Sequence, residues 1–222
     1  MKTDKKNIFH WAAGILLCCL GIALFTKANF GLSMIAAGPY LLHVLLRDAM
    51  PWFSQGTAEY VWEALLLLVL ALLMRQFKIR WLLSFGTAII TGLIIDLYFS
   101  LMGGNGVFAT MAERLLAYAG GTVSCAIGVA CYFRTNLPLQ VYELVVMEQA
   151  ERTGKSTDKV KWAFDITMLC ICVAMAAVVL LLRGFWTGIS WGTAVTTFVN
   201  APLIAVAGKI IDRLEKKNGR RE

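Results

Sequence analysis

The side chains in this chain that could do chemistry are a few polar residues within or just after long apolar segments. Asp96 lies in one such segment, and Asn200 lies in another, two residues before Pro202. An ionisable residue in a membrane-spanning helix is a functional candidate by default, and a proline there frees a backbone carbonyl that needs a new partner. With Asn29 and Asn136, these residues are our candidates for a substrate cavity. Asp96 could instead reach the outer membrane interface.

Two cations, Lys27 and Arg134, stand two residues before the two asparagines that follow apolar segments. One interpretation is that each cation snorkels to the membrane interface. The other is that the two form entrances for an anionic or zwitterionic solute.

Glu59 and Glu63 lie one helical turn apart at the expected start of a further apolar segment. A helix dipole favours carboxylates near its N-terminus, which would explain them. The alternative is a role in cation or proton coupling.

Nothing in the sequence is typical of an enzyme, a metal site or a cofactor site. The six cysteines lie in apolar runs without a C-x-x-C pair, and the two histidines are isolated. Residues 103–106 are glycine-rich, but no strand precedes them and no Gly-Lys-Ser/Thr follows, so they are not a phosphate loop. We predict no catalytic residue, no bound metal and no cofactor.

The composition indicates that these residues lie in or next to membrane-spanning helices. Of 222 residues, 59% are hydrophobic and 16% are charged, against about 45–50% and about 25% in soluble domains. An ordinary soluble enzyme and a disordered chain are both excluded, and the long apolar runs predict an all-α, polytopic membrane protein. The net charge of +7 is explained by basic loops, so we expect no nucleic acid partner.

Six apolar segments are long enough to span a membrane, and two are short. Residues 137–151 include several carboxylates, each of which costs about 2.5–3.5 kcal/mol at the centre of a span. We therefore expect this segment, and by analogy residues 32–46, to re-enter the membrane or to lie at its interface. The expected spans are residues 8–26, 59–74, 81–102, 109–133, 162–182 and 189–211.

The distribution of Lys and Arg gives the orientation. With six spans, one side of the membrane holds 17 of the 21 Lys and Arg residues. Because basic loops stay in the cytoplasm, both termini are predicted to be cytoplasmic.

The chain also contains an internal repeat. With a shift of 107 residues, seven of the 21 positions from Ala12 to Leu32 are identical, and a second match occurs at a shift of 106. We divide a single membrane domain, residues 1–222, into repeat 1 (about 8–106), repeat 2 (about 109–213) and a charged cytoplasmic tail (214–222). Three spans per repeat make the second copy inverted.

Four glycines occupy equivalent places in the two copies. Small residues allow close helix packing, and a substrate path along the same face is the alternative. These residues are Gly14, Gly21, Gly121 and Gly128.

The run Gly21–Gly31, followed by Gly38-Pro39, resembles the YczE/YyaS/YitT group of small bacterial membrane proteins. The resemblance implies a bacterial inner membrane location, and it supplies no substrate and no site residues. Residues 137–151 lack a matching Gly-Pro, so the two short segments need not be equivalent.

Inverted repeats are common in secondary transporters, so we predict an inner-membrane, transporter-like protein for a small solute. The alternatives are an accessory or regulatory membrane protein acting on a partner protein, and a substrate-binding subunit of a larger importer. The expected partners are membrane lipid, a small solute, and a protein partner or a second copy of the chain.

Overall fold

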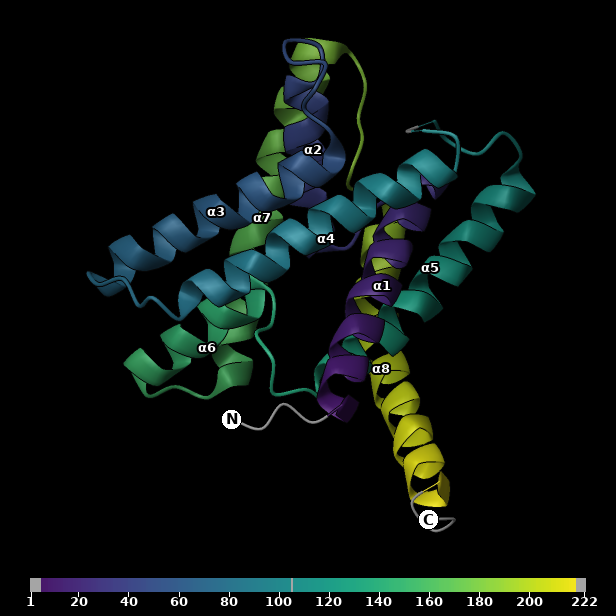
Figure 1. The fold of residues 1–222 in the computed structure, drawn as a ribbon. Helices are drawn as coiled ribbons and strands as arrows, with labels where there is room; N and C mark the ends of the chain where they lie inside the picture. Colours follow the sequence, from purple (N-terminus) through teal and green to yellow (C-terminus); the bar gives the residue numbers. More distant parts are fainter. Residues whose placement is uncertain (1–4, 105, 219–222) are drawn as a thin grey trace.

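A computed structural model describes residues 5–104 and 106–218. Within these ranges the chain forms eight helices and no strand, arranged as in Figure 1. The helices are α1 (Lys5–Ala28), α2 (Met34–Leu46), α3 (Gln55–Met74), α4 (Trp81–Leu101), α5 (Met111–Tyr132), α6 (Val141–Thr153), α7 (Thr157–Arg183) and α8 (Trp191–Asn218).

Six of the described helices are long and apolar enough to cross a membrane, namely α1, α3, α4, α5, α7 and α8. The prediction of a polytopic all-α membrane protein with six spans is therefore confirmed. The other two, α2 and α6, have 13 residues each. At 1.5 Å per residue they are about 20 Å long, too short for a hydrocarbon core of about 30 Å.

The N-terminus of α3 lies about one turn earlier than the sequence predicted. The Ser54 side chain accepts a hydrogen bond from the Thr57 amide at 2.9 Å, so the helix begins at Gln55. Serine at this position satisfies an amide that has no partner within the helix. Glu59 and Glu63 consequently lie in the second and third turns rather than at the helix end.

The antiparallel pair α1 and α5 forms the most extensive helix contact in the structure. All four glycines of the predicted repeat lie in this contact. A Cβ on Gly21 would be 2.9 Å from the Gly121 oxygen, and a Cβ on Gly128 would be 3.0 Å from the Gly14 oxygen. Only glycine allows the two backbones to approach this closely.

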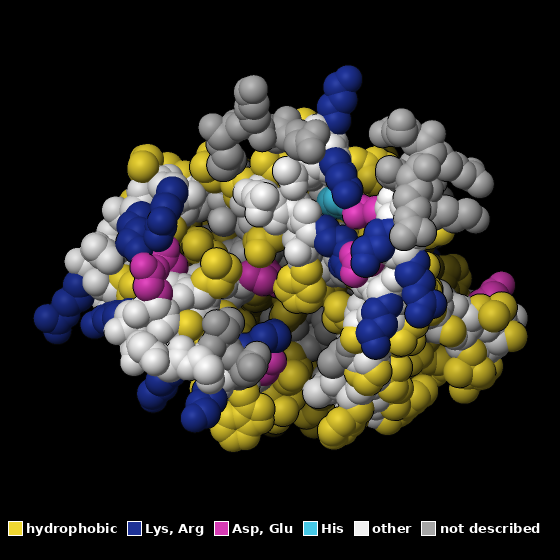
Figure 2. All heavy atoms as spheres, turned by 90° about the horizontal axis from the view of Figure 1, so that it is seen from below, with side chains coloured by type: hydrophobic (Ala, Val, Ile, Leu, Met, Phe, Trp, Pro, Cys, Tyr) yellow, Lys and Arg dark blue, Asp and Glu magenta, His cyan; other side chains and the backbone are white. Residues whose placement is uncertain are grey.

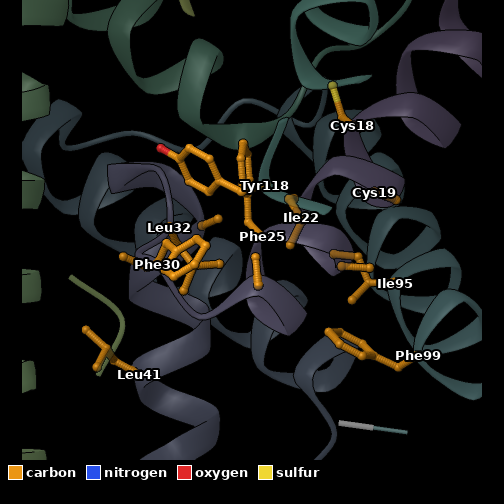
Figure 3. Packing of buried hydrophobic residues seen from close by; sticks show 14 of the residues in the cluster. Cys18, Cys19, Ile22, Phe25, Phe30, Leu32, Leu41, Ile95, Phe99 and Tyr118 are labelled. Atoms are coloured by element: carbon orange, nitrogen blue, oxygen red, sulfur yellow. The ribbon is translucent and has the colours of Figure 1, made fainter. Parts of the chain in front are cut away.

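The main apolar core surrounds α1 (Figure 3). Phe25 of α1 packs against Tyr118 of α5, with 5.4 Å between the ring centroids. Ile95 and Phe99 of α4 belong to the same cluster and are almost fully buried. Helices α1, α4 and α5 therefore form one packed unit.

The two short helices connect the halves of the chain. Helix α2 packs against α3 and α7, and α6 packs against α7, α3 and α4. Helix α4 packs against α3, whereas α7 and α8 do not form a packed pair over their described residues. This difference between the halves is visible in Figure 1, where α8 extends away from α7.

Ion pairs show which connections share a face. They join the start of α1 to the end of α8, the end of α5 to α8, and the α3–α4 loop to α6. The pairs are Lys6–Glu215, Arg134–Asp212 and Lys78–Glu148, with N–O distances of 2.7, 2.8 and 2.5 Å. We call the face formed by residues 5–7, 75–80, 134–161 and 209–216 the basic face.

Candidate functional site

The inward side of α3 carries two buried carboxyl groups. Glu59 is 1% exposed and Glu63 is 0% exposed, and their spacing of four residues places them on one helix face. Within the described ranges, neither forms an ion pair with a cation. Both oxygens of Glu59 and Oε1 of Glu63 are buried without a hydrogen-bond partner there. Burial of an unpaired carboxylate is among the most expensive features a fold can contain.

Among the described residues, helix α6 provides the one hydrogen bond to the side chains of this pair. The amide of Val141, the first residue of α6, donates to Oε2 of Glu63 at 3.1 Å. Two hydrogen bonds hold the preceding loop on α4. The Thr87 hydroxyl donates to the Pro138 oxygen at 3.1 Å, and the side-chain amide of Gln140 donates to the Thr91 hydroxyl at 3.4 Å. The N-terminus of a short helix therefore points at a buried carboxyl group, as its dipole favours.

A third carboxyl group lies nearby in the first turn of α6. The Oε2 atom of Glu143 is buried and has no hydrogen-bond partner among the described residues. Burial raises the pKa of this carboxyl above its usual value. Glu143 lies two residues after Val141, whose amide donates to Glu63. We call Glu59, Glu63 and Glu143 the carboxyl cluster.

Further hydroxyl and thiol groups lie on α5, α6 and α1. The Tyr132 hydroxyl is buried without a partner in the described part of the chain, and Tyr142 donates to the Ile35 oxygen at 3.2 Å. The Cys19 thiol donates to the Thr91 oxygen at 3.6 Å.

This arrangement favours the binding of protons. Two carboxyl groups on one helix face, buried without a cation among the described residues, cannot both be ionised without a counter-charge, and protons are the smallest species that supply it. Among the described residues, no group of three His, Cys, Asp or Glu side chains is close enough to hold a metal ion.

Close packing against α4 fixes α3 in position. A Cβ on Gly56 would be 2.0 Å from the Gly92 oxygen, and a Cβ on Gly92 would be 2.4 Å from the Gly56 oxygen. Asp96 completes the contact: it accepts a hydrogen bond from the Ser54 hydroxyl at 2.5 Å and one from the Gly56 amide at 2.8 Å. Asp96 therefore caps the N-terminus of α3.

The four residues predicted to line a cavity do not come together. Asn29 is exposed at the end of α1, where its carbonyl accepts a hydrogen bond from Arg114 at 3.1 Å. Asn136 is exposed near the other end of α1, because the adjacent Thr135 donates to the Asn7 oxygen at 3.1 Å. Residues 7 and 29 are about 33 Å apart along a helix. One cavity cannot contain both asparagines.

The remaining two candidates, Asp96 and Asn200, lie on α4 and α8, which do not form a packed pair over their described residues. Asp96 caps the N-terminus of α3, as described above. Asn200 lies midway along α8, where its Oδ1 atom is buried without a hydrogen-bond partner among the described residues. Helix α8 does not pack against α3.

Both predicted entrance cations make contacts within the fold. Lys27 is 4% exposed and donates to the Gly104 oxygen at 2.8 Å, with its ammonium 5.2 Å from the centre of the Phe108 ring. Arg134 binds Asp212 and donates to the Gly208 oxygen at 2.7 Å. Lys27 thus secures the α4–α5 connection, and Arg134 joins α5 to α8.

The sequence analysis did not bring Glu59, Glu63 and Glu143 together. It assigned Glu59 and Glu63 mainly to a helix end, although Ser54 followed by Gln55-Gly56-Thr57 is a readable helix start. It treated Glu143 only as a reason for residues 137–151 not to span. No sequence signal shows that Glu143 approaches α3, because that contact is tertiary.

Comparison with known proteins places the chain in a family. The model of a family of unknown function, DUF6198, matches residues 5–209. The uncharacterized protein YyaS of Bacillus subtilis (strain 168) is 26% identical over 207 residues, which cover 92% of this chain and 93% of that protein. This match agrees with the resemblance to the YczE/YyaS/YitT group. No solved structure matches the chain significantly. The chain is a multi-pass membrane protein that belongs to the DUF6198 family.

Proposed function

We propose that this protein is a bacterial inner-membrane transporter for a small solute, with proton binding at Glu59 and Glu63 as the coupling step. The observation that carries the proposal is the burial of these two carboxyl groups in a membrane helix without a counter-ion among the described residues. Ionisable groups in such positions are costly and typically mark ion pathways and proton relays. An apolar pair in the same place would be more stable, so stability alone does not account for the glutamates.

A change in charge at this pair would be transmitted to α6. Glu63 accepts from the first amide of α6, and Glu143 lies in the same turn. A proton on Glu63 removes the charge that this helix end favours. Protonation therefore weakens the contact between α3 and α6, and this contact joins the two halves of the chain.

The predicted inverted repeat supports a transport mechanism of the rocking type. Leu17 and Ser124 are 107 residues apart and touch each other, since the Ser124 hydroxyl donates to the Leu17 oxygen at 2.8 Å. A two-fold axis relating the halves would pass through such a contact.

A second pair of contacts has the same relation. Thr87 of α4 donates to the Pro138 oxygen. Thr193 and Gly31 stand at the equivalent positions, and a Cβ on Gly31 would be 2.6 Å from the Thr193 hydroxyl. The first contact joins the loop after α5 to α4, and the second joins the loop after α1 to α8. In each case a loop of one half meets the last helix of the other half.

The proposal is tested with purified protein in liposomes that contain a pH-sensitive dye. A panel of metabolites is added outside, and solute uptake and internal acidification are recorded together. We expect one solute to move with protons, and we expect Glu59→Gln and Glu63→Gln to abolish the acidification. Glu151→Gln, at an exposed glutamate of α6, is the matched control and should behave as wild type.

Absence of both uptake and binding across the panel would refute the transport proposal. Solute uptake with unchanged acidification in both glutamine variants would refute the assignment of the coupling step.

A further inference from the structure

A groove opens on the basic face beside the gap between α7 and α8. Its volume is about 640 Å³. The end of α5 forms its floor, the start of α7 forms one edge, and α8 forms the other. The lining residues are Ala130, Phe133, Arg134, Lys161, Ile204, Ala205, Gly208, Lys209 and Asp212.

The groove has an apolar wall and a cationic rim. Phe133 and Ile204 contribute large apolar side chains to its lining. Arg134 in the loop after α5, Lys161 of α7 and Lys209 of α8 provide three positive charges in the lining, against one negative charge from Asp212. The groove therefore combines an excess of positive charge with a surface that hydrocarbon would cover.

Arg134 is rigid, whereas the two lysines can accommodate a ligand. The Arg134 guanidinium donates to Asp212 at 2.9 Å and to the Gly208 oxygen at 2.7 Å, so its position is fixed. The Lys161 side chain is 54% exposed and makes one pair with Asp165 at 3.2 Å. Lys209 is exposed as well. One guanidinium held by the fold and two exposed ammonium groups, all lining one groove, are suited to a phosphate group.

The surrounding surface fits a ligand that enters from the membrane. Figure 2 views the molecule from the side of the termini and shows Lys and Arg side chains gathered around a hollow with apolar borders. The groove lies between the start of α7 and α8, two membrane-spanning helices that do not form a packed pair over their described residues. Leu181 of α7 and Phe198 of α8 are exposed by 84% and 79%, so both helices carry apolar side chains on their surfaces.

We propose that this groove binds an anionic phospholipid, with the headgroup phosphate between Lys161, Lys209 and Arg134 and an acyl chain along the apolar wall. Basic pockets between membrane helices at the cytoplasmic surface are suited to such lipids. A soluble anion would leave the apolar wall exposed, and a zwitterionic lipid would leave the excess positive charge unmatched. The lipid would also fill the place where the second half of the chain lacks a helix pair.

The test is a lipid titration of the purified protein in a neutral detergent, with the melting temperature as readout. Phosphatidylglycerol should raise the melting temperature in a saturable way. Phosphatidylcholine and soluble glycerol phosphate should leave it unchanged, because the first lacks net charge and the second lacks acyl chains. The double variant Lys161→Gln/Lys209→Gln should need about 20-fold more phosphatidylglycerol for half of the shift, as expected for two surface charges.

The matched control is the double variant Lys155→Gln/Lys216→Gln. It removes the same charge from exposed residues of the basic face that do not line the groove, and its titration should follow wild type. Equal weakening in both double variants would overturn the proposal in favour of diffuse surface attraction. A response to glycerol phosphate as large as that to phosphatidylglycerol would overturn it in favour of a free-anion site. A stable dimer that excludes phosphatidylglycerol would overturn it in favour of a second copy of the chain.

Discussion

In the predicted repeat, helices α3 and α7 occupy corresponding places in the two halves of the chain, but their surroundings are very different. Helix α3 is enclosed by α2, α4 and α6, whereas the described residues of α7 pack mainly against α2 and α6. The carboxyl groups of α3 are consequently buried, while Asp165 of α7 remains partly exposed and pairs with Lys161 on its own helix. Enclosure by a third helix is what turns ordinary acidic residues into a candidate functional site.

Two positions of the predicted repeat bear on this difference. At its shift of 106 residues, Gly92 corresponds to Phe198, and Asp96 corresponds to Pro202. Gly92 permits backbone contact with α3 and Asp96 caps it. Phe198 is too large for a backbone contact, and a proline has no carboxylate to offer. These two residues do not allow α8 to make with α7 the contact that α4 makes with α3.

The largest expected effect comes from Gly92→Ala. The new Cβ would be 2.4 Å from the Gly56 oxygen, and because this atom belongs to the backbone it cannot simply rotate away. We expect a loss of about 3 kcal/mol in the free energy of unfolding, measured as a large drop in melting temperature in detergent. Gly86→Ala on the same helix is the control, since nothing lies within 4 Å of its Cβ. Equal melting temperatures for the two variants would contradict the enclosure argument.

The Asp96 cap should have a smaller effect. Asp96→Ala leaves the Gly56 amide without its partner, and we expect a cost of about 2 kcal/mol. Asp96→Asn retains an acceptor and should recover about half of that loss. Thermal melts of both variants measure the loss of stability, and their transport activity is recorded for comparison. If Asp96→Ala abolished transport at an unchanged melting temperature, the cavity role predicted from the sequence would be restored.

The sequence predicted the spans well, because the length and the apolarity of each span can be read from the local residue composition. It did not show the partner of Asp96, because nothing local to that residue reveals that α3 approaches within backbone contact of α4. It did not show the partner of Lys27 for a similar reason: the Gly104 oxygen that binds the ammonium is 77 residues away. The number of helices follows from sequence, but the partner of an isolated polar group follows from packing.

The third prediction concerns the ion pairs that Glu148 of α6 forms with the α3–α4 loop. Glu148 is 3% exposed and accepts hydrogen bonds from Lys78, Arg80 and Trp81, the last two at 2.8 and 2.9 Å. Burial acts to raise the pKa of this carboxyl, but the three hydrogen bonds together hold it below its usual value. Glu148→Gln loses both charge pairs, for which we expect a cost of about 1 kcal/mol at pH 7 because the cations are partly exposed.

The pH dependence of this difference has a definite sign. A carboxyl whose pKa is lowered on folding stabilises the protein at pH values above its unfolded pKa of about 4.3. That stabilisation is lost as the pH falls through the lower folded value. Wild type and Glu148→Gln should therefore differ most at pH 7 and converge on acidification. A gap between the two melting curves that widened toward low pH would rule out this account.

The smallest change in stability is expected for Glu63→Gln, a variant that tests whether this carboxyl group is needed for function or for folding. Glu63→Gln keeps the size of the side chain and retains an acceptor for the Val141 amide, while it removes a buried ionisable group. We expect a melting temperature at pH 8 that equals or slightly exceeds that of wild type, with the free energy of unfolding within about 1 kcal/mol, because the cost of burying the carboxylate offsets what the Val141 amide and its helix end contribute. Asp165→Asn, at the corresponding helix of the other half, should be equally harmless. A folded Glu63→Gln protein that no longer carries protons would show that α3 retains its carboxyl groups for transport. A variant that unfolds would instead assign Glu63 to the structural contact between α3 and α6.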